Sequence, residues 1–330
     1  MTNDTRTDLP LVTIAIPSFN HRKFIGECIE SILAQTYENI ELVIIDDGSE
    51  DNSAELIATY FESCTARLTR YEFITQKNQG LCATLNTAIE WSRGKYFMGI
   101  ASDDSLEPLK TSLLVEYLER EDPNVAGVFG GATFVTERGV PFGIYKPVPG
   151  YYGFDDIFLR ERGYIITVGQ LLRTDVLKKV GGYADDVYIE DLYMWLLLTS
   201  LGYKLRVVPE LVAKRRLHTS NISGNVLKMY EGRLRILGAY KSHPNYELVV
   251  ARVTLSLSLE YSSTNKMLAL RYLNEARRFY PRIVLDSAFI ITLARFVAPG
   301  WLLKIARLIR RKIEKFQLNK LVRKSVDGEP

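Results

Sequence analysis

The first hundred residues alternate short apolar runs with helical patterns, and this alternation limits the possible folds more than any other feature of the sequence. Apolar runs predicted as buried strands cover residues 11–16, 40–45, 70–75 and 96–101, with helical patterns between them at 24–35, 52–61 and 81–91. Strands and helices joined by short connections favour right-handed crossovers and a largely parallel sheet with helices on its faces. We therefore predict an α/β fold.

The pattern loosens after Asp104. Helices are predicted at 107–121, 174–180 and 190–201, strands at 125–130 and 204–208, and a hairpin with loops in the Gly-, Pro- and Tyr-rich stretch 139–154. From about Asn225 the chain is predicted to be all-helical. Residues 1–10 are polar and lack an apolar segment, so we expect a disordered N-terminus and neither a signal peptide nor an anchor.

Charge and cysteine content exclude several classes of protein. The formal charge is +3, but residues 301–324 alone carry +8, which leaves about −5 for the rest. A mildly acidic body argues against nucleic-acid binding. The three cysteines show no CxxC spacing, so we expect neither a disulfide framework nor a zinc site, and a reducing cytoplasm is the expected compartment.

Polar clusters follow each of the four predicted strands. They are PSFN (17–20), DDGS (46–49), KNQG (77–80) and SDD (102–104). Each cluster alone is also typical of an ordinary turn or helix cap. However, the carboxyl ends of parallel strands meet at one edge, which is where such sheets bind ligands. Two Asp-Asp pairs at one edge would repel each other, and a divalent cation with a diphosphate would join them.

These motifs together resemble family 2 glycosyltransferases of the GT-A fold. The resemblance rests on the run 12–53, NQG, Asn86, GKYFMGIASDD, GGY and IEDLYMWL, and it covers about two thirds of the chain. No GxGxxG follows the first strand, which disfavours a dinucleotide-binding dehydrogenase. The resemblance implies a GT-A domain over 11–224, with a nucleotide-binding half (11–104) and an acceptor half (105–224). A helical extension would cover 225–330.

The resemblance also implies a donor site. The loop after the first strand and Asp47 would hold the nucleotide base, and the segment 78–81 would lie along base and ribose. Asp103 would lie nearest the ribose. The implied donor-binding residues are Pro17, Ser18, Phe19, Asn20, Asp46, Asp47, Asn78, Gly80, Leu81, Ser102 and Asp103.

The same resemblance implies a divalent metal, Mg²⁺ or Mn²⁺, held by Asp104, Asp103 and His218. Ala101 stands where many relatives have an acidic residue, which removes one carboxylate from the metal shell. For His218, a solvated loop position is an equal alternative. His21 and His243 lie in unremarkable polar stretches and receive no role.

For the acceptor half, Glu190 and Asp191 resemble the acidic pair of the family at the start of a helix. Asp191 is the predicted base that takes the proton of an acceptor hydroxyl, and Glu190 is its neighbour or substitute. Alternatively, both carboxylates only favour a helix N-terminus through its dipole. Tyr193 and Leu197 replace an acidic residue and an arginine of the family pattern, so we expect a different acceptor pocket.

The basic tail has an amphipathic pattern. Residues 301–316 place Leu302, Ile305, Leu308, Ile309 and Ile313 on one helical face and basic residues on the others. Such helices lie in anionic membrane surfaces. The alternative is a helix packed on the body or on a partner chain.

The sequence therefore predicts an inverting, metal-dependent glycosyltransferase on the inner face of the cell membrane. It would move a sugar from a UDP- or dTDP-sugar donor to a hydroxyl of a lipid-linked or cell-surface glycan. Transfer to a soluble or protein acceptor, and a non-catalytic sugar-nucleotide-binding module, are the alternatives. A nucleotidyltransferase is a further alternative, but the basic, Gly-rich loop that would hold a triphosphate is missing after the first strand.

Overall fold

The computed structural model describes residues 9–219, 221 and 224–297. The chain divides into two compact units, residues 1–217 and 218–330. The first unit combines strands with helices, and the described part of the second is helical.

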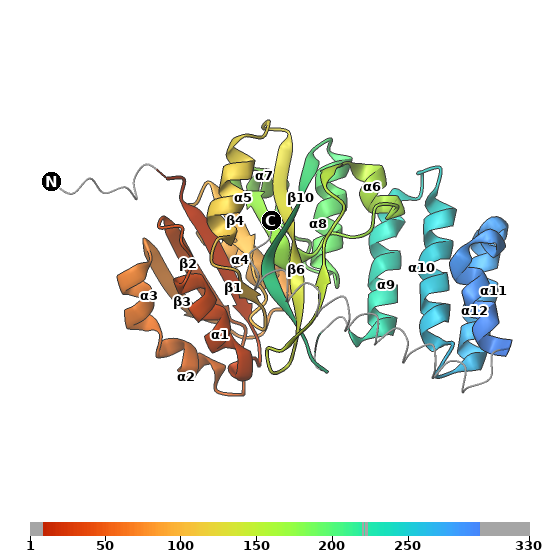
Figure 1. Ribbon diagram of the computed structural model, residues 1–330, viewed down its shortest axis with the longest axis horizontal. Helices are drawn as coiled ribbons and strands as arrows, with labels where there is room; N and C mark the ends of the chain where they lie inside the picture. The colour runs from red at the N-terminus through yellow and green to blue at the C-terminus, as the bar shows by residue number, and fades with distance from the viewer. Residues whose placement is uncertain (1–8, 220, 222–223, 298–330) are drawn as a thin grey trace, which may run out of the picture. The chain divides into compact units, whose positions relative to one another are not determined.

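Parallel strands form the first half of the sheet (Figure 1). β1 (Val12–Ser18) pairs in parallel with β2 (Ile40–Asp46) and with β4 (Tyr96–Gly99). β2 pairs in parallel with β3 (Arg70–Thr75). The crossovers run through α1 (Arg22–Leu33), α2 (Ser53–Ala58), α3 (Phe61–Arg67) and α4 (Leu81–Trp91). The carboxyl ends of these strands therefore meet at one edge, as predicted.

The second half makes the sheet mixed. β9 (Gln170–Arg173) lies antiparallel between β4 and β6 (Val125–Thr136), and β10 (Lys204–Leu217) runs parallel to β6. β5 (Ser105–Leu106) pairs with the far side of β10. Short strands β7 (Pro141–Tyr145) and β8 (Gly150–Tyr152) pair with β6 and β10. The helices of this half are α5 (Lys110–Glu119), α6 (Phe154–Leu159), η2 (Thr167–Gly169), α7 (Thr174–Lys179) and α8 (Glu190–Ser200).

The core lies on the central strands and explains their composition. Every residue of β2 is buried, and Ile14, Ile16, Leu42 and Ile44 are completely inaccessible to solvent. Parallel strands covered on both faces are nearly continuous apolar runs, unlike the alternating strands of a half-exposed sheet. The predicted α/β class is confirmed.

Two predicted elements differ from the structure. The helical pattern 52–61 is interrupted, and two short helices, α2 and α3, take its place. The strand predicted at 204–208 extends to Leu217. Val212, Ala213 and Arg216 in this extension are buried. This longer strand carries Arg215 and Arg216 beside the SDD segment that follows β4.

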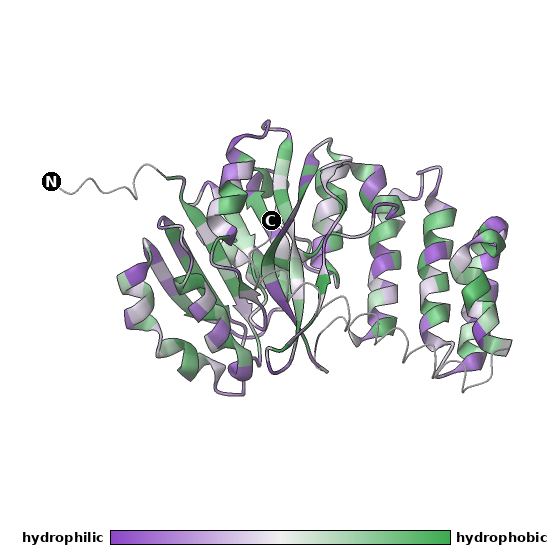
Figure 2. Cartoon of the chain, in the orientation of Figure 1, coloured by the Kyte–Doolittle hydropathy of each residue, from purple (hydrophilic) through white to green (hydrophobic). Residues whose placement is uncertain are grey.

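In the second unit, α10 (Tyr246–Tyr261) packs against α9 (Val226–Leu237), α11 (Lys266–Phe279) and α12 (Ser287–Val297). Short 3-10 turns, η4 (Gly238–Tyr240) and η5 (Pro281–Leu285), join them. Apolar and polar bands alternate along these helices in Figure 2, as expected for amphipathic helices. Ala251, Leu255, Leu273 and Phe289 belong to their common core. Within the described residues, no helix has both the length and the apolar character needed to cross a bilayer. The predicted amphipathic segment 301–316 lies outside them.

Candidate functional site

The loop after β1 is fastened to the loop after β2. Asn20 has a left-handed backbone (φ 54°), and its N–H donates to Ser49 Oγ at 2.8 Å. The Asn20 side-chain oxygen accepts from the Glu50 N–H at 2.8 Å. Phe19 directly precedes Asn20 and has 46% of its surface exposed. The predicted base-binding loop is thus a rigid rim with an exposed aromatic ring.

Buried polar atoms meet at the ends of β1 and β2. Ser18 pairs with Asp46 across the two strands, and both residues are almost fully buried. Asp46 Oδ1 accepts from the Ser49 N–H at 2.9 Å, whereas Asp46 Oδ2 and Ser18 Oγ have no hydrogen-bond partner in the structure. Because buried polar atoms are nearly always paired, these two atoms fit a ligand that supplies a donor and an acceptor.

Asp47 organises the loop after β3. Its carboxylate accepts from the N–H groups of Gln79 and Gly80 and from the Gln76 side chain, each at 2.8 Å. Gly80 has φ +89°, a conformation suited to glycine, and precedes α4, whose first residue is Leu81. The structure therefore brings Asp47 together with the 78–81 segment. A carboxylate has about four acceptor positions, so Asp47 retains capacity for a base, and that role remains a prediction.

The pair Asp103–Asp104 is locked to β10 by Arg216. The Arg216 N–H donates to Asp104 Oδ1 at 2.7 Å, and its Nε donates to the Asp103 carbonyl at 2.9 Å. Both carboxylates are 7% exposed. Burial raises the pKa of Asp104 to about 8; the Asp103 charge raises it too, while the Arg216 N–H and the charges of Arg215 and Arg216 oppose the rise. Two adjacent buried carboxylates repel each other, so a bound proton or cation is needed to compensate their charge.

A cluster of possible metal ligands includes one residue that the sequence did not predict. Ligand atoms of His21, Asp103 and His218 lie within 4.8 Å of one another. His218 is bonded directly to the last residue of β10, which positions it. His21 Nδ1 lies 2.7 Å from Ser102 Oγ. The expectation that His21 is unremarkable is therefore wrong. Its place just after β1, at the same edge as SDD, was the available signal.

On the acceptor side, Glu190 and Asp191 begin α8. Asp191 Oδ2 accepts from Thr167 Oγ1 at 2.8 Å, and Asp191 Oδ1 accepts from the Leu192 N–H at 2.5 Å. Burial raises the pKa of Glu190 to about 8, the Asp191 charge raises it further, and the Arg215 charge lowers it. Asp191 therefore accepts two hydrogen bonds, whereas burial favours the protonated form of Glu190.

Arg215 connects the two acidic pairs electrostatically. Its positive charge lowers the pKa of Asp104 and also that of Glu190. Arg216 is almost fully buried and donates to protein groups, whereas Arg215 is partly exposed. Of the two arginines, Arg215 is therefore the one suited to a ligand anion between the pairs.

Hydrogen bonds also join α4 to the segment that precedes α8. Asn86 Nδ2 donates to the Tyr183 carbonyl at 2.7 Å, and the Tyr183 N–H donates to Asn86 Oδ1 at 2.8 Å. Gly182 has φ +71° and passes so close to Asn86 that an added Cβ would lie 2.4 Å from its side-chain oxygen. The motif GGY thereby fixes the start of α8 relative to the nucleotide-binding half.

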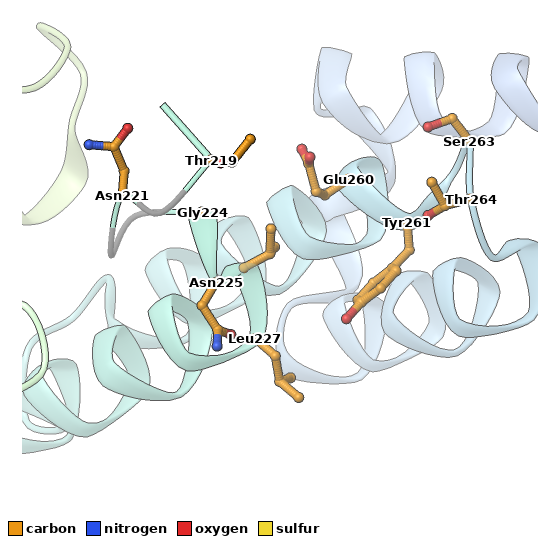
Figure 3. A pocket seen from close by; sticks show the side chains of 10 residues that line it. Thr219, Asn221, Gly224, Asn225, Leu227, Glu260, Tyr261, Ser263 and Thr264 are labelled. Atoms are coloured by element: carbon orange, nitrogen blue, oxygen red, sulfur yellow. The ribbon is translucent and has the colours of Figure 1, made fainter. Parts of the chain in front are cut away.

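The second unit has a pocket of about 660 Å³, shown in Figure 3. No residue predicted for the donor site, the metal or the base lines it. The lining residues are Thr219, Asn221, Gly224, Asn225, Val226, Leu227, Glu260, Tyr261, Ser263 and Thr264.

Comparisons with solved structures agree with the predicted GT-A fold. Residues 1–349 of TarS from S. aureus, in complex with UDP-GlcNAc, match with a TM-score of 0.61 and 16% identity over 87% of this chain and 88% of the 1–349 chain. The mannosyltransferase PcManGT from Pyrobaculum calidifontis, in complex with GDP-Man and Mn²⁺, matches with a TM-score of 0.57 and 13% identity over 88% of each chain. At these identities the likeness shows the fold.

Sequence comparisons identify the family. Chondroitin synthase of Escherichia coli is 39% identical over 121 residues, which is 37% of this chain and 17% of the synthase. The chain spans 22% of a similar uncharacterised glycosyltransferase from Rickettsia felis. The model of glycosyl transferase family 2 matches residues 13–181, about half of the chain, and ends before Glu190. The chain therefore belongs to glycosyl transferase family 2.

Proposed function

We propose that this protein is an inverting, metal-dependent glycosyltransferase that moves a sugar from a UDP- or dTDP-sugar to a hydroxyl of a lipid-linked or cell-surface glycan. The observation that carries the proposal is the placement of Arg215. Its charge acts on Asp104 and on Glu190, so a carboxylate of the donor side and one of the acceptor side both lie near Arg215. A diphosphate there would meet a cation on one side and a base on the other.

The donor assignment is supported by the unpaired atoms at the β1–β2 edge. Ser18 Oγ and Asp46 Oδ2 offer a donor and an acceptor, respectively, in a buried position, next to Asp47 and the exposed ring of Phe19. A nucleoside supplies both complementary groups and an aromatic face. TarS was solved with UDP-GlcNAc, which favours uridine, whereas PcManGT was solved with GDP-Man. Release of GDP from GDP-mannose in the test below would therefore indicate a purine nucleotide donor.

Asp191 would act as the base. The acceptor hydroxyl gives its proton to the Asp191 carboxylate as its oxygen bonds to the anomeric carbon. The bond from that carbon to the diphosphate oxygen breaks on the opposite face, which inverts the configuration. Arg215 would interact with the diphosphate as it leaves. Asn86 and Tyr183 would keep α8, and with it Asp191, in register with the donor.

The residues present fit a divalent cation. His21, Asp103 and His218 would hold it, with Asp104 beside them, and the cation would neutralise charge on the leaving diphosphate. Two imidazoles and a carboxylate suit a transition metal better than Mg²⁺, which prefers oxygen ligands. We therefore favour Mn²⁺.

The test is a panel of donors incubated with the full-length protein and with p-nitrophenyl glycosides as acceptors. The panel contains UDP-GlcNAc, UDP-glucose, dTDP-glucose and GDP-mannose. We expect release of nucleoside diphosphate from a UDP- or dTDP-sugar, loss of release in EDTA, and recovery on addition of Mn²⁺. Release of pyrophosphate would indicate a nucleotidyltransferase. Donor binding without turnover would indicate a non-catalytic module, and transfer that ignores EDTA would contradict metal dependence.

Peripheral attachment to the inner face of the membrane is part of the proposal. It is supported by the nine basic residues and the apolar stripe in residues 301–324. We expect the full-length protein to sediment with vesicles containing phosphatidylglycerol, and less so at high salt. A chain ending at Ala298 should remain soluble and still release nucleoside diphosphate. The full-length control replaces Lys304, Arg307, Arg311, Lys312 and Lys315 with Gln and should also lose vesicle binding. Unfolding of both variants would instead indicate that the tail packs on the protein.

A further inference from the structure

We propose that Thr167 is a positioning residue for the acceptor-side base: its hydroxyl holds the Asp191 carboxylate in the orientation that receives the acceptor proton. This inference rests on the proposed function and adds a residue to it. Thr167 lies outside the motifs that identify the family and belongs to a 3-10 turn, η2, rather than to α8.

The contact is direct and leaves Asp191 little freedom. Thr167 Oγ1 donates to Asp191 Oδ2 at 2.8 Å, while Oδ1 of the same carboxylate accepts from the Leu192 N–H at 2.5 Å. Each carboxylate oxygen therefore has one donor. The plane of the carboxylate is fixed, and the remaining acceptor positions are available to a hydroxyl that approaches from solvent.

The turn that carries Thr167 is itself held by the core. The Lys110 ammonium, 1% exposed, donates to the Val168 carbonyl at 2.5 Å. Gly169 packs so closely on β6 that an added Cβ would lie 2.2 Å from the Gly130 carbonyl oxygen. Gln170 Nε2 donates to the Gly99 carbonyl at 3.3 Å. Because Val168, Gly169 and Gln170 are all held by other elements, the Thr167 hydroxyl has a fixed position from which to orient Asp191.

The chemical consequence concerns the charged form of Asp191. A hydroxyl that donates to a carboxylate stabilises its negative charge, so it favours the form that can accept a proton. The other groups near this pair are Glu190 on the same helix, Arg215 on β10, Cys82 on α4 and Tyr183 before α8. Only Arg215 among these carries a positive charge. Loss of the Thr167 hydroxyl should therefore slow the transfer of the acceptor proton to Asp191.

The test compares Thr167→Val, which keeps the shape and removes the donor, with Thr167→Ser, which keeps the donor. With the donor identified by the panel and p-nitrophenyl glycosides as acceptors, Thr167→Val should lower kcat about tenfold, as expected for a hydrogen bond to a charged group. The donor KM should stay unchanged. Thr167→Ser should restore kcat. Thr199→Val is the control, because Thr199 is buried in α8 and its hydroxyl donates to the Trp195 carbonyl.

A double-mutant comparison separates positioning from general stability. In an Asp191→Asn background, Thr167→Val should cause little further loss, because the carboxylate on which it acts is gone. A full additional loss in that background, or a failure of Thr167→Ser to restore kcat, would overturn the proposal. If Thr167→Val fails to fold, Thr167→Cys, a weaker donor of similar size, gives the same reading. A wild-type protein inactive with every donor contradicts the proposed function, whereas an active wild type with an unaffected Thr167→Val contradicts only the positioning role.

Discussion

The two acidic pairs, Asp103–Asp104 and Glu190–Asp191, differ in how the fold holds them. Each contains one carboxyl whose pKa burial raises to about 8. The donor-side pair is 7% exposed, and its contacts run to the backbone N–H and the guanidinium of Arg216 on a long strand. The acceptor-side pair is partly exposed at the start of a helix, and a side-chain hydroxyl, that of Thr167, holds Asp191.

This difference suggests different demands on the two pairs. Contacts from the main chain of a sheet survive most side-chain changes, so they suit a ligand that stays the same, such as a cation with a diphosphate. Asp191 is oriented in part by a side-chain hydroxyl, so a single substitution at Thr167 can change its orientation. Arg215, whose charge acts on both pairs, would then link the donor side to the acceptor side.

The largest effect is expected at the base. Asp191→Asn should lower turnover by roughly 10² or more while donor affinity stays unchanged, because general-base catalysis usually contributes at least that factor. Glu190→Gln should lower turnover far less than Asp191→Asn if Glu190 is mainly protonated. Turnover and donor binding by calorimetry measure the two effects. Near wild-type transfer by Asp191→Asn would remove Asp191 from the mechanism, and a larger loss in Glu190→Gln would exchange the two roles.

A smaller effect is expected on the donor side. Asp104→Ala should remove the part of UDP affinity that Mn²⁺ adds, on the order of tenfold or more, since ligands and their close neighbours typically contribute 10–100-fold to metal affinity. Calorimetric titration of UDP with and without Mn²⁺ measures this increment. Asp175→Ala, at an exposed carboxylate that begins α7, is the control. If Mn²⁺ increases the UDP affinity of Asp104→Ala as much as that of wild type, Asp104 does not contribute to cation binding, and His21, Asp103 and His218 would hold the cation without it.

The sequence predicted the donor edge better than the acceptor side, for a physical reason. In a parallel sheet, residues directly after the strands share an edge, so the neighbourhood of Asp46, Asp47 and Asp103 follows from local patterns alone. Thr167 lacks such a signal. Its contact with Asp191 depends on a 3-10 turn whose place is set by Lys110 and by close packing on Gly130, neither of which is visible as a periodic pattern.

The prediction also ended the strand that begins at Lys204 too early. The strand continues to Leu217, and Arg216 is buried because Asp103, Asp104 and Glu27 lie around it. Long-range charge compensation of this kind requires the fold to be known. The roles of Asp47 and Asp104 toward ligands remain predictions.

The smallest effect, and the one that tests the comparison most directly, concerns stability. The folded-state pKa of Glu190 lies near 8, well above its ordinary 4.5. The folded protein therefore keeps a proton that the unfolded chain releases, and this contribution is complete below about pH 4.5 and is lost as pH rises through 8. Glu190→Gln is neutral at every pH, so it should be more stable than wild type by a few degrees in Tm at pH 8.5, with a smaller difference at pH 5. Glu62→Gln, at an exposed site in α3, should show no such dependence. A Tm difference that does not change between the two pH values would mean that Glu190 is already ionised in the folded protein. In that case Asp191 has a charged neighbour at neutral pH, and the acceptor-side pair would depend on Arg215 rather than on a retained proton.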